Sequence, residues 1–194
     1  MRLGAWIAVS ILTAVSGVCL TSNRGASQDA ARSSPPAADA LTAYDLIASV
    51  LQGPRCLNCH PRGDRPTQGD DRHIHGMNVQ RGIDGNGMPA MRCSTCHQEH
   101  NSDMAGVPGA PHWHLAPASM GWAGLSKAAL CRTLLDRAKN GGRSVADLIA
   151  HMTGDKLVRW AWDAGARRSA PPLTVDELKT ALDAWAIAGA PCPK

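Results

Sequence analysis

The pattern Cys-x-x-Cys-His occurs twice in the chain, at residues 56–60 and again at residues 93–97. Two thiols three positions apart lie on the same side of one helical turn, and the histidine that follows faces the same region. This spacing is typical of c-type haem attachment, in which the two thiols bond to one porphyrin and the histidine binds its iron. The sequence therefore predicts two covalently attached haem c groups, with thioether links from Cys56, Cys59, Cys93 and Cys96 and proximal iron ligands His60 and His97.

Two other uses of paired cysteines fit the sequence less well. A zinc site built from two Cys-x-x-Cys pairs usually has about 15–20 residues between the pairs, whereas 33 residues separate Cys59 from Cys93. Zinc also gives no reason for a histidine directly after each pair. A thioredoxin-like redox pair needs a strand–helix–strand context, which the sequence lacks. Haem attachment is the interpretation that accounts for both motifs completely.

The N-terminal residues 1–27 resemble a secretory signal peptide, with Arg2 before an apolar stretch from Leu3 to Leu20. Ser and Thr interrupt this stretch, so we expect no stable membrane span after cleavage. Cys19 is a lipid-attachment candidate, but Val18 before it is unfavourable for a lipoprotein signal. We therefore expect a periplasmic protein, and residues 28–40, rich in Ser, Ala and Pro, as a flexible leader.

Composition adds two constraints. Of the 20 Lys and Arg residues, two lie in residues 1–27, which leaves 18 basic against 16 acidic residues in the remainder. This small excess, without a basic run, argues against a nucleic-acid partner. The chain has no Phe and a single Tyr, so two porphyrins are expected to supply much of its flat apolar mass. A compact chain of this length has a radius of about 15 Å, so we expect the two haems to be close neighbours.

Helical signals lie on both sides of a long irregular segment. Apolar spacing predicts a helix over residues 41–52, and residues 54–124 show no sustained periodicity. Capping residues predict helices from Ser126 to about Lys139, from Ser144 to about Met152 and from Thr174 to Ala188, with a short helix over residues 155–163. No strand is expected. The predicted fold class is mainly α: a small cytochrome c-like helical domain over residues 41–194, with long loops wrapped around two haems.

The second axial ligand of each iron must come from downstream of Cys56, because residues 28–55 contain neither His nor Met. Between the motifs, His75 is the predicted ligand of the first haem, with His73 as its close alternative. His114 is the predicted ligand of the second haem, and the neighbouring Trp113 is expected to pack on a porphyrin face. His151 lies on a helical face, where a hydrogen-bonded packing role is more usual than ligation, and it stays an alternative.

The remaining candidates are weaker. His100 is expected on a solvated helix, and the methionines are expected to fill haem pockets, with Met88 and Met120 still open as ligands. The segment 84–87 resembles a calcium-binding loop but lacks the later bidentate Glu, so it is interpreted as a flexible turn at a haem edge.

Cys131 and Cys192 form an even pair in an exported chain, which predicts a disulfide rather than two unpaired thiols.

Several segments resemble small exported dihaem cytochromes that are labelled as a subunit of isoquinoline 1-oxidoreductase. The similarity covers residues 54–193 and is carried by residues 54–61, 63–70, 113–117, 140–144, 160–162 and 189–193. His73, His75, His114 and His151 fall where that family also has His. The resemblance implies a cytochrome that takes electrons from a dehydrogenase, such as a molybdenum hydroxylase. The chain itself has no sign of a molybdopterin-binding or iron–sulfur domain, so we do not expect it to perform hydroxylation.

The sequence thus predicts a monomeric periplasmic dihaem c-type cytochrome that is an electron carrier rather than an enzyme. Its expected partners are redox proteins, with a dehydrogenase as donor and a cytochrome or oxidase as acceptor. The alternative is a dihaem peroxidase-like enzyme with one open iron, although no acid–base pair is recognisable beside a motif. A haem-based sensor is less favoured, because no output domain is present.

Overall fold

The structure is a computed structural model that describes residues 37–165 and 167–194. The described residues belong to one compact unit. The predicted signal peptide, Cys19 and the predicted leader up to residue 36 lie outside the described residues. No helix in the described ranges is long and apolar enough to cross a membrane.

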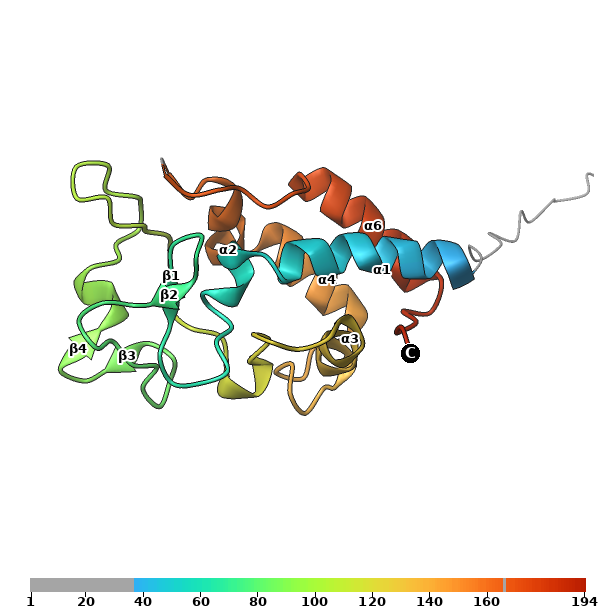
Figure 1. Ribbon diagram of the computed structural model, residues 1–194, viewed down its shortest axis with the longest axis horizontal. Helices are drawn as coiled ribbons and strands as arrows, with labels where there is room; N and C mark the ends of the chain where they lie inside the picture. The colour runs from blue at the N-terminus through green and yellow to red at the C-terminus, as the bar shows by residue number, and fades with distance from the viewer. Residues whose placement is uncertain (1–36, 166) are drawn as a thin grey trace, which may run out of the picture. The chain divides into compact units, whose positions relative to one another are not determined.

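Within the described residues the fold is mainly α, as predicted (Figure 1). The elements in chain order are α1 (Ala37–Leu51), α2 (Pro54–Leu57), β1 (Thr67–Gln68), β2 (His73–Ile74), β3 (Gly87–Met88), β4 (Met91–Arg92), the 3-10 helices η1 (Cys93–Thr95) and η2 (Ala118–Met120), α3 (Lys127–Leu135), α4 (Val145–Gly154), α5 (Lys156–Arg159), the 3-10 helix η3 (Trp160–Trp162) and α6 (Val175–Ile187).

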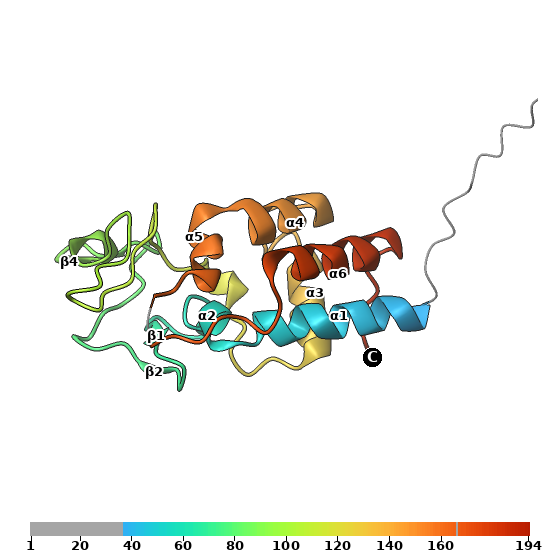
Figure 2. The same ribbon diagram turned by 90° about the horizontal axis from the view of Figure 1, so that it is seen from above.

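The hydrophobic core lies between α1, α3, α4 and α6. Helices α1 and α6 run side by side in both views (Figures 1 and 2). Tyr44 and Trp185 are fully buried between them, with ring centroids 5.5 Å apart. The Tyr44 hydroxyl donates to the Lys127 carbonyl at 2.9 Å, which ties α1 to the start of α3. The only Tyr of the chain therefore sits at the centre of the helical core.

Three predicted helix starts are confirmed by their caps. The Ser126 hydroxyl accepts from the Ala129 N–H at the start of α3. Ser144 with Asp147, and Thr174 with Glu177, form reciprocal capping boxes at the starts of α4 and α6. These side chains satisfy backbone N–H groups that have no partner within the helix.

Some predicted bounds were wrong. Helix α1 begins at Ala37, inside the predicted leader, because alanines are the strongest helix formers. Helix α3 ends at Leu135 rather than near Lys139, because the buried Asn140 amide donates to the Leu134 carbonyl and so replaces a helical partner. The short helix predicted over residues 155–163 is divided into α5 and η3.

The expectation of no strand was also wrong, although the strands in the described part of the chain are only two residues long. β1 pairs antiparallel with β2, with Thr67 opposite Ile74, and β3 pairs antiparallel with β4, with Gly87 opposite Arg92. All four lie in the loop region, away from α3, α4 and α6 (Figures 1 and 2). Each pair is a local hairpin contact between loop segments and forms no extended sheet.

A buried arginine organises the loops between the two motifs. Arg81 is 5% exposed and donates to the carbonyls of Pro61 and Gly63 at 3.1 Å, and also to the carbonyl of Ala116. One guanidinium thus joins the chain after the first motif to the segment before η2. Such bonds satisfy carbonyl groups that no helix or strand serves.

The predicted disulfide is present. Cys131 in α3 is bonded to Cys192, with their Cα atoms 5.6 Å apart. The Trp185 indole N–H donates to the Pro191 carbonyl at 2.9 Å, which holds the chain end against α6. The last residues are therefore attached both to α3 and to α6.

Candidate functional site

Both Cys-x-x-Cys-His motifs adopt the same backbone turn. In the first, which includes α2, the N–H groups of Cys59 and His60 donate to the Cys56 carbonyl at 3.2 and 3.0 Å. In the second, which includes η1, the N–H groups of Cys96 and His97 donate to the Cys93 carbonyl at 3.2 and 2.9 Å. The single helical turn expected from the spacing is confirmed for both motifs.

The His60 ring is held by one hydrogen bond and one aromatic contact. Its Nδ1 lies 2.7 Å from the Met120 carbonyl oxygen, an acceptor, so Nδ1 carries the proton. Its ring stacks on Trp122 with centroids 3.4 Å apart and planes 9° apart. Burial lowers the pKa of His60 to about 3, against the opposing effect of the Met120 bond, so the ring is neutral. In this tautomer the Nε2 lone pair is available to a ligand.

His97 is held in the same way by different residues. Its Nδ1 donates to the Pro108 carbonyl at 2.7 Å, and its ring stacks on Trp113 with centroids 4.4 Å and planes 5° apart. Burial lowers its pKa as well. Sequence reasoning placed Trp113 on a porphyrin face and overlooked Trp122. Trp113 and Trp122 both follow the second motif in the chain, so sequence order gives no signal that Trp122 belongs with the first.

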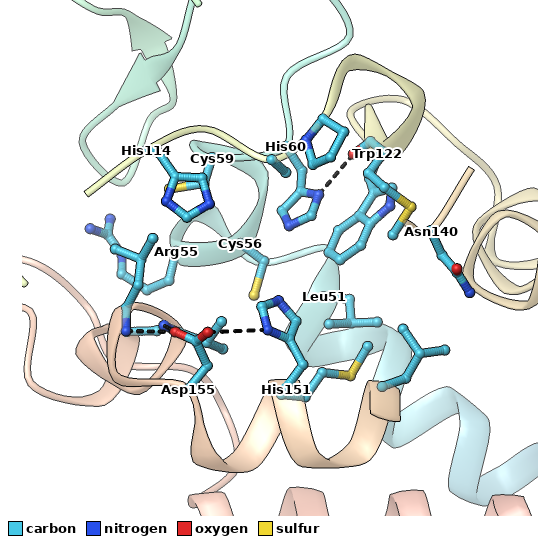
Figure 3. Close-up of a pocket in the computed structure, with 18 of the residues that line it drawn as sticks. Leu51, Arg55, Cys56, Cys59, His60, His114, Trp122, Asn140, His151 and Asp155 are labelled. Atoms are coloured by element: carbon cyan, nitrogen blue, oxygen red, sulfur yellow. Dashed lines mark hydrogen bonds and ion pairs between the residues drawn. The ribbon is translucent and has the colours of Figure 1, made fainter. Parts of the chain in front are cut away.

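The first motif opens onto a cavity with about 950 Å³ of space, including the part open to solvent. Figure 3 shows His60 and His151 projecting into it from opposite sides, His60 from the chain after α2 and His151 from α4. Most of the other lining residues are apolar: Leu51, Ala116, Pro117, Met120, Trp122, Leu148, Met152, Leu157, Val158, Trp160 and Ala161. The polar and charged ones are Arg55, His114, Asn140, Arg143 and Asp155.

The thiols of the first motif are neutral in this environment. Burial raises the pKa of Cys56 to about 12, with Cys59 adding to the rise and Arg55 opposing it. The pKa of Cys59 is raised to about 11, chiefly by burial, with Arg55 opposing and Cys93 adding to the rise.

One segment of backbone joins the two motifs. The Ala116 N–H donates to the Cys59 carbonyl at 3.2 Å, and the Leu115 N–H donates to the Gly85 carbonyl at 2.9 Å. The same Gly85 carbonyl lies 3.9 Å from the Cys93 Sγ. A Cβ on Gly85, whose φ is +78°, would lie 2.7 Å from the Leu115 carbonyl oxygen, so this close approach requires glycine.

His151 lies on a helix and has a carboxylate near its Nδ1. It lies in the last turn of α4, and its Nδ1 is 3.4 Å from Asp155 Oδ2. A carboxylate near Nδ1 favours the tautomer with the proton on Nδ1, in which the Nε2 lone pair is available to a ligand. Burial lowers the pKa of His151, with Arg143 adding to the decrease and Asp155 opposing it. This residue, treated as an alternative in the sequence analysis, faces the first motif.

The structure pairs the two preferred histidines with the opposite motifs from those predicted. His75 lies beside His97, with ring centroids 6.0 Å apart and planes 68° apart, and its Nδ1 is 3.0 Å from the Gly76 carbonyl oxygen. His114 is exposed and lines the first cavity instead. The physical reason is that the chain between the motifs is irregular: Thr67 is tied to Asn58 of the first motif, whereas His75 reaches His97, an arrangement that no sequence period encodes.

His73 uses both of its ring nitrogens elsewhere. Its Nδ1 is 2.6 Å from Asp71 Oδ1, and its Nε2 is 2.9 Å from the Gln68 amide nitrogen. His73 is also exposed. The ring therefore has no lone pair directed toward either motif, which separates it from His75 two positions later.

Three buried side-chain nitrogens lack a hydrogen-bond partner within the described residues: Arg55 Nε, Arg81 Nε and Trp122 Nε1. Arg55 and Trp122 both line the first cavity. Buried donors without partners are costly unless something accepts from them. An acidic group bound in the cavity could accept hydrogen bonds from these two nitrogens and would explain why the chain supplies no partner for them.

The methionine candidates have other roles or other positions. Met120 is buried at the first cavity, where its carbonyl holds His60, and Met88 is 44% exposed. The segment 84–87 is a well-tied turn: the Asp84 carboxylate accepts from the Asn86 N–H at 3.0 Å and pairs with Arg92 at 2.9 Å. No group of three or more His, Cys, Asp or Glu side chains suited to a metal ion occurs in the ranges that the structure describes.

Comparison with protein-family models, with curated proteins and with solved structures finds no match to this chain.

Proposed function

We propose that the chain is an exported dihaem c-type cytochrome that carries single electrons, with one haem c attached at each Cys-x-x-Cys-His turn. The main support is that His60 and His97 are held alike. Each gives its Nδ1–H to a backbone carbonyl and stacks on a Trp ring. Both histidines thus keep the Nε2 lone pair that an iron ligand needs. This match at two motifs 37 positions apart favours the same role for both.

The cavity at the first motif fits a porphyrin in its chemistry. Its lining is mostly apolar, as in other cofactor sites. Cys56 and Cys59 lie on its wall for the two thioether links. The unpartnered Arg55 Nε and Trp122 Nε1 are donors suited to acidic propionates. The cofactor would therefore satisfy the buried groups that the chain leaves unpaired.

For the second axial ligands we propose His151 at the first site and His75 at the second. His151 enters the first cavity opposite His60 (Figure 3), with the Asp155 carboxylate 3.4 Å from its Nδ1. His75 is the predicted candidate whose ring lies beside His97, with ring centroids 6.0 Å apart. His151 replaces His75 as the ligand proposed for the first haem, and His75 replaces His114 for the second.

When bound, haem iron supplies the one-electron redox chemistry. The chain's residues hold the ligand nitrogens in position, and apolar side chains such as Leu148 and Met152 exclude water from the first site. The neighbouring motifs favour passage of an electron between sites. A periplasmic location and a dehydrogenase donor rest on the N-terminal sequence and on the family resemblance.

The first test is haem content. Full-length chain produced in a host that matures c-type cytochromes should carry two haems per chain by pyridine haemochrome assay and by mass. The reduced protein should show two six-coordinate low-spin irons. Colourless protein, or protein that retains zinc, would overturn the proposal. Rapid carbon monoxide binding at one iron would instead favour the peroxidase-like enzyme.

The second test assigns the ligands. His151→Ala and His75→Ala should each convert one iron to high spin, as seen by electron paramagnetic resonance, while both haems stay attached. His73→Ala is the matched control for His75→Ala and should leave both irons low-spin. A high-spin iron in His114→Ala, with none in His151→Ala, would show that the first ligand is wrongly assigned.

A further inference from the structure

Trp160, in η3, contacts both candidate sites. One part of its half-buried side chain lines the cavity of the first motif. Its ring meets Trp113 edge to face, with centroids 4.8 Å apart and planes 78° apart. Trp113 in turn stacks on His97 of the second motif. A continuous line of aromatic contacts therefore runs from the first cavity to the proximal histidine of the second site.

A hydrogen-bond path follows the same route. The Trp160 indole N–H donates to Asn101 Oδ1 at 2.8 Å, and this oxygen also accepts from the Gly109 N–H at 3.0 Å. Gly109 follows Pro108, whose carbonyl holds the His97 ring. The Asn101 amide also donates to the Asp163 carbonyl at 2.8 Å. Trp160 is thus tied to the loop that orients His97 as well as to its stacking partner.

On the other side, Trp160 lies beside the first motif. The guanidinium of Arg55 is 6.0 Å from the Trp160 ring centroid, within the range of a cation–π contact. Arg55 directly precedes Cys56 and is 4% exposed, and it pairs with Asp70. The position of Trp160 is therefore fixed from both motifs at once.

We propose that Trp160 is the positioning residue that couples the two sites, because it sets the relative placement of the first cavity and His97 and fills the space between them. This inference rests on the proposed function. In the coupled step one electron is lost at one site and gained at the other, and no bond or proton changes. The Trp160–Trp113 pair places two half-buried aromatic rings in contact between the sites.

The test compares Trp160→Leu with Trp160→Phe and uses Trp162→Phe as the matched control. Trp162 is two residues away, packs against the helical core and donates its indole N–H to the Leu173 carbonyl at 2.7 Å. Trp162→Phe and Trp160→Phe therefore each remove one indole hydrogen bond from the same short helix. Of these two positions, only Trp160 contacts both sites.

Three readouts are needed on the intact dihaem protein: haem content, the electron paramagnetic resonance spectrum of each iron, and the rate of electron exchange between sites after pulsed reduction. Trp160→Leu should keep two haems, shift the signal of the second iron and slow the exchange severalfold. Trp160→Phe should recover part of the exchange rate, because a ring still meets Trp113. Trp162→Phe should match wild type in both signal and rate.

The result that overturns this inference is an exchange rate and a second-iron signal in Trp160→Leu equal to those of wild type. Equal slowing in Trp160→Leu and Trp162→Phe would also overturn it, since the effect would then be a general loss of packing. If Trp160→Leu fails to fold, Trp160→Phe decides by the same readouts. Wild-type chain with fewer than two haems would instead overturn the proposed function.

Discussion

The two Cys-x-x-Cys-His turns share a backbone conformation but lie in different surroundings. The first follows α1 directly, and Cys56 packs against the helical core next to the buried Leu57. The second lies between β4 and a loop, and its Cys96 is exposed. The five-residue pattern therefore sets the local turn, while the burial of each motif is set by the remainder of the chain. Since solvent exposure tunes the reduction potentials of haem centres, we expect the two sites to differ in reduction potential.

The largest expected difference concerns stability after loss of each attachment site. Cys56→Ala with Cys59→Ala, and Cys93→Ala with Cys96→Ala, should each reduce haem content from two to one. The first pair should also lower the thermal midpoint much more, because it empties a cavity against the core. Haem assay and circular dichroism melting measure both effects. Ser94→Ala, inside the second motif, should keep two haems, and equal melting losses in the two double variants would contradict the comparison.

Removal of the disulfide should increase local opening in the helical region and not around the second motif. Cys131→Ala with Cys192→Ala opens a loop with a sequence separation of 61, and the chain-entropy model gives a loss of about 4 kcal/mol. Denaturant unfolding measures the total loss. Amide hydrogen exchange should accelerate in α3 and the last residues but not around the second motif. Equal acceleration of exchange in both regions would mean that the helical region and the loops around the second motif unfold together.

The smallest effect is a pH dependence at the second site. The Asn86 N–H, followed by Arg92, lowers the pKa of Asp84 to about 2, below the unfolded value of about 4. The folded carboxyl therefore contributes stability that is present above pH 4 and is lost as the pH falls through about 2. Wild type should lose stability relative to Asp84→Asn between these pH values, as measured by denaturant unfolding. A constant difference between the two proteins would contradict this.

Local patterns in the sequence predicted much of this arrangement. The motif turns, the capping boxes at Ser144 and Thr174, and the disulfide each depend on a few residues whose chemistry is specific. The positions of His75 and His151 relative to the motifs could not be predicted in the same way. They depend on non-periodic loops held by contacts such as those of Arg81, whose acceptors lie 18 to 35 residues away. The early end of α3 likewise depends on a single buried amide, that of Asn140.

The carbonyl groups that hold the two proximal histidines lie at unequal distances along the chain. The acceptor for His97 is 11 residues downstream, whereas the acceptor for His60 is 60 residues downstream. A loop of about ten residues closes within about 10–100 ns, and closure becomes entropically harder as loops lengthen. His97 can therefore adopt its final orientation through contacts within its own segment. His60 can do so only after the segment that contains Met120 and Trp122 has folded against the first motif. During folding, the motif that comes later in the sequence is expected to be organised first.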